Sequence, residues 1–199
     1  MKAKIKNTEE NVMRKISIEK VVLSVGGTAE NLEKGVRLLK YLVKERKPAK
    51  KKARKRIPSL GVRPGLEVGT VLTIRKNKEE LLKRMLNAID NKLKRKQISN
   101  NNFSFGIKEY IEIPGVEYQR DIGITGLDVT VVFKRAGRRV RLKKIKSGRI
   151  PEKQTIKPKE IIKFMEDNFG TKFTGKIRDE NIKNVLKEKH QDILREDKE

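Results

Sequence analysis

The stretch Ile16-Ser-Ile-Glu-Lys-Val-Val-Leu-Ser-Val-Gly26 decides the fold, because it is a long run of β-branched and aliphatic residues that ends at two glycines. Such residues favour strands and glycines favour turns, so the stretch predicts a strand followed by a tight turn at Gly26 and Gly27. A helix is expected after this turn, with Thr28 as its cap and an end near Lys44. The apolar residues that recur on one face of this helix are Leu32, Val36, Leu39 and Val43.

Further strands and helices are predicted from the periodic spacing of apolar residues along the rest of the chain. Strands are predicted at Val68–Arg75, Phe103–Ile113 and Ile122–Phe133, and helices at Lys78–Leu93 and Pro158–Gly170. The strands alternate between apolar and polar residues, which favours an antiparallel sheet with one covered face. The predicted fold class is therefore α+β, an antiparallel β-sheet with helices packed on one face.

The chain is expected to have three parts. Residues 1–15 are polar and predict a flexible N-terminal segment, and residues 16–170 contain the α+β domain. Residues 171–199 are a charged tail with eight basic and seven acidic residues, in which Asp179–Arg195 has a helical pattern. Almost all of the net charge therefore lies before the tail.

The net charge of +25, from 51 Lys and Arg against 26 Asp and Glu, predicts a polyanionic partner. Nucleic acid, an anionic membrane and an acidic protein are the three candidates. The basic runs contain no amphipathic basic helix, and the sequence contains neither a span of about 20 apolar residues nor a signal peptide. Nucleic acid is therefore the preferred partner, with no membrane and a cytoplasmic location.

Two internal runs carry much of this charge. Lys44–Arg56 has nine basic residues among thirteen, and Lys134–Arg149 has nine among sixteen with no acidic residue. Phosphate contacts from such runs supply affinity but little sequence preference. Between the first run and the next strand, Ile57–Gly69 is rich in Pro and Gly, which predicts a loop at the tip of a hairpin.

Catalysis is poorly supported by the sequence. It has one histidine, His190, and no cysteine, and its Gly26-Gly27-Thr28 turn lacks the spacing of a phosphate-binding P-loop. No cofactor, no metal site and no enzymatic activity are therefore expected. Aromatic residues make up only 5% of the chain, and Phe103, Phe105 and Tyr118 suit packing as well as base stacking. Folded RNA, recognised by shape and backbone, is favoured over single-stranded RNA and over DNA.

Eight segments of the chain form a recognisable series across roughly residues 10–170. They are Ile18-Glu-Lys-Val-Val-Leu-Ser-Val-Gly26, Lys47-Pro48 through Lys52-Ala-Arg-Lys55, Ile57-Pro-Ser-Leu-Gly-Val-Arg63, Asn102-Phe-Ser-Phe-Gly-Ile-Lys-Glu109, Ile113-Pro-Gly-Val-Glu-Tyr118, Asp121-Ile-Gly-Ile, Gly126-Leu-Asp-Val-Thr-Val131 and Arg149-Ile-Pro. In this order they resemble the universal large-subunit ribosomal protein family that binds 5S rRNA, the ribosomal protein L-five family, in its archaeal and eukaryotic form. The blocks from Asn102 and from Gly126 are the most specific.

The resemblance implies an antiparallel sheet with helices on one side and a place in the central protuberance of the large subunit. It implies binding to 5S rRNA and adjacent 23S rRNA, contact with P-site tRNA through a loop, and contact with neighbouring ribosomal proteins, including one of the small-subunit head. Family positions for 5S rRNA recognition fall on Ser24, Arg46 and Thr73, where Ser24 replaces the usual Asn and Arg46 the usual Gln.

Together, the charge runs and the resemblance give the expected binding residues. Those expected to bind rRNA are Ser24, Arg46, Lys47, Lys50, Lys51, Lys52, Arg54, Lys55, Arg56, Thr73, Arg138, Arg139, Arg141, Lys143 and Lys144. Those expected to face tRNA are Ser59, Leu60, Gly61, Val62 and Arg63. Two rival functions stay open on the residues alone: a stand-alone RNA or DNA binder, such as a chaperone or regulator, and an RNA-modifying enzyme.

Overall fold

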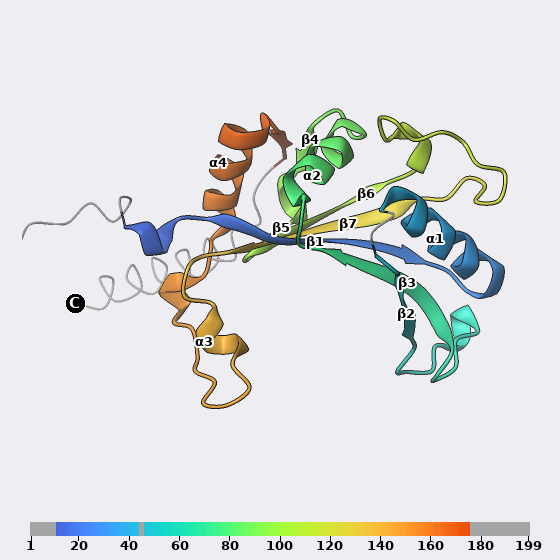
Figure 1. The fold of residues 1–199 in the computed structure, drawn as a ribbon, viewed down its shortest axis with the longest axis horizontal. Coiled ribbons are helices and arrows are strands. Elements are labelled where there is room, and N and C mark those ends of the chain that lie inside the picture. Colours follow the sequence, from blue (N-terminus) through green and yellow to red (C-terminus); the bar gives the residue numbers. More distant parts are fainter. Residues whose placement is uncertain (1–10, 44–45, 176–199) are drawn as a thin grey trace, which may run out of the picture.

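The computed structural model of this chain describes residues 11–43 and 46–175, and its main element is a six-stranded antiparallel sheet (Figure 1). The strand order is β2-β3-β1-β7-β6-β5, so β1, which is the strand predicted from Ile16 to Gly26, lies near the middle of the sheet. A separate two-stranded parallel sheet pairs β4 with β8. The strand bounds are β1 Ser17–Gly26, β2 Ala49–Lys52, β3 Glu67–Ile74, β4 Lys92–Lys94, β5 Ile98–Ser99, β6 Asn102–Ile107, β7 Leu127–Lys134 and β8 Lys172–Thr174.

Three helices cover one face of the six-stranded sheet. In Figure 1 α1, α2 and α4 lie above the strands, whereas the short α3 lies below them. The helix bounds are α1 Ala29–Leu42, α2 Lys78–Asn87, α3 Arg139–Leu142 and α4 Pro158–Phe169, with short 3-10 helices at Val12–Arg14, Pro58–Leu60, Arg95–Gln97, Tyr110–Glu112 and Glu152–Gln154. The predicted α+β class, with an antiparallel sheet, is confirmed.

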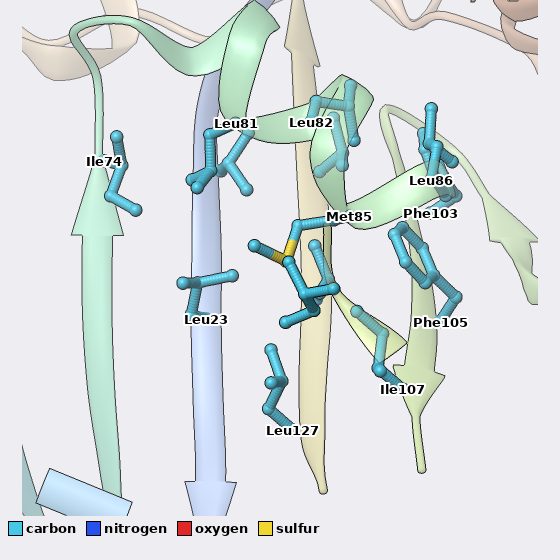
Figure 2. Close-up of a cluster of buried hydrophobic side chains, with 14 of the residues drawn as sticks. Leu23, Ile74, Leu81, Leu82, Met85, Leu86, Phe103, Phe105, Ile107 and Leu127 are labelled. Atoms are coloured by element: carbon cyan, nitrogen blue, oxygen red, sulfur yellow. The ribbon is translucent and has the colours of Figure 1, made fainter. Parts of the chain in front are cut away.

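The core lies between these helices and the covered face of the sheet. Alternate residues of β1, β3, β6 and β7 point into it, because successive side chains of a strand face opposite sides. Figure 2 shows Leu82, Met85 and Leu86 of α2 lying over Leu23 of β1, Leu127 of β7 and Phe105 of β6. At the other end, α4 packs Phe164 edge-on against Phe133, with ring centroids 5.7 Å apart. Within the part of the chain that the structure describes, α1, α2 and α4 leave the opposite face of the sheet uncovered.

The three helices predicted before residue 171 are confirmed, with two differences from the predicted ends and caps. α1 begins after Thr28 as expected, but the Thr28 side chain makes no capping hydrogen bond, and Lys44 lies outside the described residues. α2 ends at Asn87, not at Leu93. Asp90 and Asn91 adopt positive φ angles of 52° and 55°, which stop the helix and turn the chain into β4. Leu93 is buried as predicted, but from a strand.

The strands differ from the predictions mainly in length. The strand expected at Phe103–Ile113 ends at Ile107, and a 3-10 turn at Tyr110–Glu112 follows it. The strand expected at Ile122–Phe133 begins only at Leu127, because Ile122 is buried from a loop. Inside the first basic run the structure contains a strand that the sequence did not predict, β2, whose four residues are all exposed.

The α+β domain was predicted to end at residue 170, but β8 lies beyond this residue and pairs with β4. Lys172 aligns with Lys92 and Thr174 with Lys94 in a parallel register. The expected N-terminal segment falls mostly on residues outside the description, and so does the helix expected at Asp179–Arg195. In the part of the chain that the structure describes, no helix is long and apolar enough to cross a membrane.

Candidate RNA interface

The open face of the sheet is the surface that the three helices leave uncovered, and its side chains are small or polar. In register, Ser24 of β1 lies between Val71 of β3 and Asp128 of β7, and Val22 lies between Thr73 and Thr130. Ser104 of β6 continues the second row beside Thr130. Because these side chains are short, a bulky ligand can approach the strands closely. The hydroxyl groups can then form hydrogen bonds with it.

The structure brings together the three family positions for 5S rRNA recognition: Ser24 and Thr73 lie on this face, and Arg46 lies beside Thr73. Thr73 pairs with Val22 and Ser24 with Val71, so the two hydroxyl residues are diagonal neighbours on adjacent strands. The Arg46 Nη1 atom donates a hydrogen bond to the Thr73 carbonyl oxygen at 3.1 Å. Arg46 itself is exposed, so its remaining guanidinium donors stay available to a ligand at the edge of the open face.

The first basic segment, residues 46–56, forms the outer edge of the sheet beside the open face. β2 pairs with β3 and presents three consecutive lysines, all exposed. The Lys50 ammonium lies 3.0 Å from a Glu67 carboxylate oxygen, so part of its charge is already compensated. The other predicted rRNA-binding residues here are exposed and have no salt-bridge partner among the described residues: Lys47, Lys51, Lys52, Arg54, Lys55 and Arg56.

The loop predicted to face tRNA lies between β2 and β3. Ile57 and Val62 form an isolated antiparallel bridge, and Gly61 turns the chain between them in the left-handed conformation. Ser59, Gly61 and Arg63 are exposed, and Leu60 has 70% of its surface exposed. Val62 is only 7% exposed, so it holds the loop together and offers little surface to a partner.

The second basic segment, residues 138–149, follows β7 and includes α3. Arg138 forms a salt bridge with Glu19 of β1 and also donates to the Phe133 carbonyl oxygen at 3.4 Å. This residue therefore anchors the segment to the sheet. The other predicted contacts from this segment, Arg139, Arg141, Lys143 and Lys144, are all exposed.

Figure 1 shows how the two basic segments are placed: the loop between β2 and β3 and the loop around α3 both extend from the sheet on the side opposite α1, α2 and α4. They lie toward opposite ends of the molecule's long axis. The open face is thus bordered by cationic segments at both ends. Because phosphate contacts act over a Debye length of about 8–10 Å, such borders attract and hold a long polyanion lying across the face.

Three residues of the open face were not predicted from the sequence: Ser104, Asp128 and Thr130. They alternate with buried residues in β6 and β7, and this alternation could have identified them. Phe103 and Phe105 belong to the buried set at 1% and 4% exposure, so base stacking on them is ruled out, whereas Tyr118 is 53% exposed. Among the described residues no group of three or more His, Asp or Glu could hold a metal ion, and His190 lies outside them.

Comparison with known proteins identifies the relationship. Residues 67–169 match the family model that describes the C-terminus of the ribosomal L5 family. The large ribosomal subunit protein uL5 of Nanoarchaeum equitans is 39% identical over 81% of this chain and 97% of its own length. The proteins of the same name from Sulfolobus acidocaldarius and Picrophilus torridus are 39% and 37% identical over 93% and 98% of their lengths, covering 81% and 84% of this chain. The chain belongs to the ribosomal L5 family.

Proposed function

We propose that this chain is a structural constituent of the large ribosomal subunit, that it binds 5S rRNA on the open face of its sheet, and that it performs no catalysis. The role in the large subunit, and with it a cytoplasmic location on the ribosome, follows from membership of the family, whose members are structural proteins. The observation that carries the 5S rRNA assignment is the open face itself, with Ser24, Thr73 and Arg46 gathered on it between two basic segments.

Binding combines a short-range and a long-range contribution. The exposed bases at the two ends neutralise phosphates, which supplies affinity and a strong dependence on salt. The hydroxyls of Ser24 and Thr73, with Thr130 and Ser104 beside them, reach 2′-hydroxyls and base edges of a helix or loop resting on the sheet. Selectivity for 5S rRNA arises from this second set, and the adjacent 23S rRNA contacts the second basic segment.

The tRNA contact is assigned to the loop between β2 and β3. Ser59 and Gly61 at its tip are exposed, as is most of Leu60, and Arg63 lies two residues after Gly61. Arg63 supplies a charge for a tRNA phosphate, and the Ser59 hydroxyl can hydrogen-bond another phosphate oxygen. Because the bridge between Ile57 and Val62 holds the base of this tip, the loop presents these groups as one body.

Contact with a basic protein of the small-subunit head is assigned to the segment from Glu109 to Asp121, between β6 and β7. This segment holds four acidic residues against one basic residue, in a chain whose net charge is +25. It also exposes Ile111 and Tyr118 at 39% and 53% of their surface. Exposed acidic and apolar groups side by side fit a basic protein surface and disfavour RNA.

The 5S rRNA assignment is tested by titrating the purified chain with a 5S rRNA transcript at several salt concentrations. If about eight phosphates are neutralised, the logarithm of the association constant falls against the logarithm of salt with a slope of roughly −6 to −7. Thr73→Ala is expected to weaken binding about fivefold, the effect of one lost hydrogen bond, with the slope unchanged. Thr28→Ala, which removes an exposed hydroxyl before α1, is the matched control.

A flat salt dependence rejects the phosphate contacts, and equal affinity of the Thr73→Ala and wild-type chains rejects the assignment of Thr73. A competition experiment separates this function from a stand-alone RNA or DNA binder. An unrelated duplex of equal length should displace 5S rRNA only at much higher concentration. Equal competition by the duplex favours the stand-alone binder, and chemical turnover of either RNA favours the enzyme.

A further inference from the structure

A cleft of about 520 Å³ lies between the end of β7, the second basic segment and the residues before α4. It is outside the open face and is not explained by contact with RNA backbone alone. Its volume falls in the range of about 300–1,000 Å³ that is typical of sites for small organic ligands. A single phosphate group would leave most of this space empty.

Two residues that line the cleft, Arg135 and Gln154, have buried hydrogen-bonding atoms without partners among the described residues. Arg135, 7% exposed, uses its terminal nitrogens for the Glu160 carboxylate and the Lys153 carbonyl oxygen. Among the described residues, its Nε atom and the Oε1 atom of Gln154 are buried without a hydrogen-bond partner. Unpaired buried polar atoms cost free energy, so a donor and an acceptor are held here at a disadvantage in the unbound chain.

The wall of the cleft is apolar and its rim is cationic. Val140, Ile150 and Pro151 line the wall, and the exposed arginines 141 and 149 lie at the rim. The backbone N–H of Gly148 donates to the Val140 carbonyl oxygen at 3.1 Å, which folds the basic segment back on itself. A Cβ atom at Gly148 would lie 2.8 Å from Val140 Cγ1, so the Val140 side chain would have to shift to admit a larger residue there.

We propose that this cleft receives one unpaired nucleotide of ribosomal RNA, turned out of its stack. The base lies against Val140, Ile150 and Pro151, and its polar edge meets Arg135 and Gln154, since nucleobases present a donor beside an acceptor. Gln154 is only half-buried and has rotatable torsions, so its amide turns toward the base without movement of the backbone. The adjoining phosphates contact Arg141 and Arg149.

This assignment, which rests on the proposed function for the identity of the RNA, changes the role of the second basic segment. Its charges no longer act only on a passing backbone, because they flank a site that selects an unpaired position. Helical RNA has no free base to insert, so the cleft distinguishes a loop or bulge from a continuous duplex.

The direct test is nuclear magnetic resonance of the full chain titrated with each of the four ribonucleoside 5′-monophosphates. At least one should shift the Arg135 Nε–H and Gln154 side-chain amide resonances saturably in the millimolar range, while the Gln119 amide, outside the cleft, stays unchanged. Inorganic phosphate at equal concentration should leave the Gln154 resonance unmoved. Absence of a saturable shift, or the same shift with phosphate as with every nucleotide, overturns the proposal.

Two variants test the cleft in RNA binding. Val140→Trp places a large ring in the cleft, at a position whose side chain is 45% exposed. Gln154→Ala removes the amide that is proposed to meet the base. Gln119→Ala, outside the cleft, is the control. Both cleft variants should bind 5S rRNA or the large-subunit rRNA about tenfold more weakly, the effect of one lost base contact. Unchanged affinity of both variants for both RNAs overturns the proposal. If the wild-type chain binds 5S rRNA no better than an unrelated duplex, the proposed function is rejected. The titration with mononucleotides then still shows whether the cleft binds a nucleotide.

Discussion

At the scale of single residues, the cationic surface and the hydrophobic core meet at Arg135. This arginine is buried at the end of β7, and the Glu160 carboxylate on α4 is its charged partner. The pair joins the sheet to the helix that covers one end of it. An isolated buried guanidinium would be costly, so the placement of α4 depends on a carboxylate at position 160.

Glu160→Gln should lower the free energy of unfolding by about 1–2 kcal/mol, less than the roughly 3–5 kcal/mol of a fully buried pair, because the Glu160 side chain is 40% exposed. Urea denaturation measures this difference. Glu166→Gln, an exposed position on the same helix without a salt bridge among the described residues, should be neutral. Equal loss in both variants contradicts the assigned role of the Arg135–Glu160 pair.

Gly126 is a second position where one residue limits the fold. A Cβ atom there would lie 2.7 Å from the Lys108 carbonyl oxygen and 2.9 Å from that of Ile107. Since backbone must move to relieve these contacts, Gly126→Ala should destabilise the chain by about 1–3 kcal/mol. Gly26→Ala, where nothing lies within 4 Å, should change stability by less than about 0.5 kcal/mol. Thermal unfolding of the two variants side by side checks the contrast.

At the scale of elements, β2 is both an exposed edge strand and part of the basic surface. Lysines along an edge discourage pairing with another chain, and here they also flank the open face. Their neighbours on β3 differ, since Lys50 has Glu67 within 3.0 Å while Lys51 lies opposite Gly69. The strand therefore contains two lysines whose charges are not equivalent.

Lys51→Gln should reduce the magnitude of the salt slope of 5S rRNA binding by about 0.7–0.9, the contribution of one phosphate contact. Lys50→Gln should reduce it less, because part of the Lys50 charge is already compensated by Glu67. Salt titrations of the two variants and the wild-type chain provide the measurement. If the two variants give the same slope, the Lys50–Glu67 pair does not persist in the complex.

The elements also explain how far the sequence predicts the fold. Strong periodicity predicts β1, β3, α1 and α4 correctly, because each buries a regular apolar face. β2 and β8 have no such face, so their pairing depends on neighbours that are distant in the sequence. The helix predicted through Leu93 was too long because Asp90 and Asn91 break the backbone while the apolar pattern continues.

At the scale of the whole molecule, the basic runs and the hydroxyl-bearing open face are different surfaces. The basic runs were visible in the sequence, whereas the common face of Ser104, Asp128 and Thr130 depends on strand register. The spacing between Ser24, Arg46 and Thr73 in the sequence likewise contains no sign that they meet, apart from family resemblance. Strand pairing therefore assembles the open face, whereas the basic segments at its ends can be read from composition.

Replacing Arg139, Lys143 and Lys144 with glutamine, which leaves the residues of the cleft unchanged, should weaken binding to all RNAs alike. The salt slope should fall in magnitude by about 2–3, because up to three phosphate contacts are lost. The preference for 5S rRNA over an unrelated duplex should stay within about twofold of wild type if selectivity resides on the open face. Competition binding at two salt concentrations measures both quantities, and a collapse of the preference would assign selectivity to this segment.

The parallel ladder of β4 and β8 has a consequence for the order of events during synthesis. Lys172 leaves the translating ribosome eighty residues after its partner Lys92, so this ladder closes only when every strand of the main sheet has already emerged. The chain that precedes it contains both basic segments. A nascent polypeptide can therefore meet RNA before β4 and β8 have paired, and this pairing is the latest step of sheet formation within residues 11–43 and 46–175.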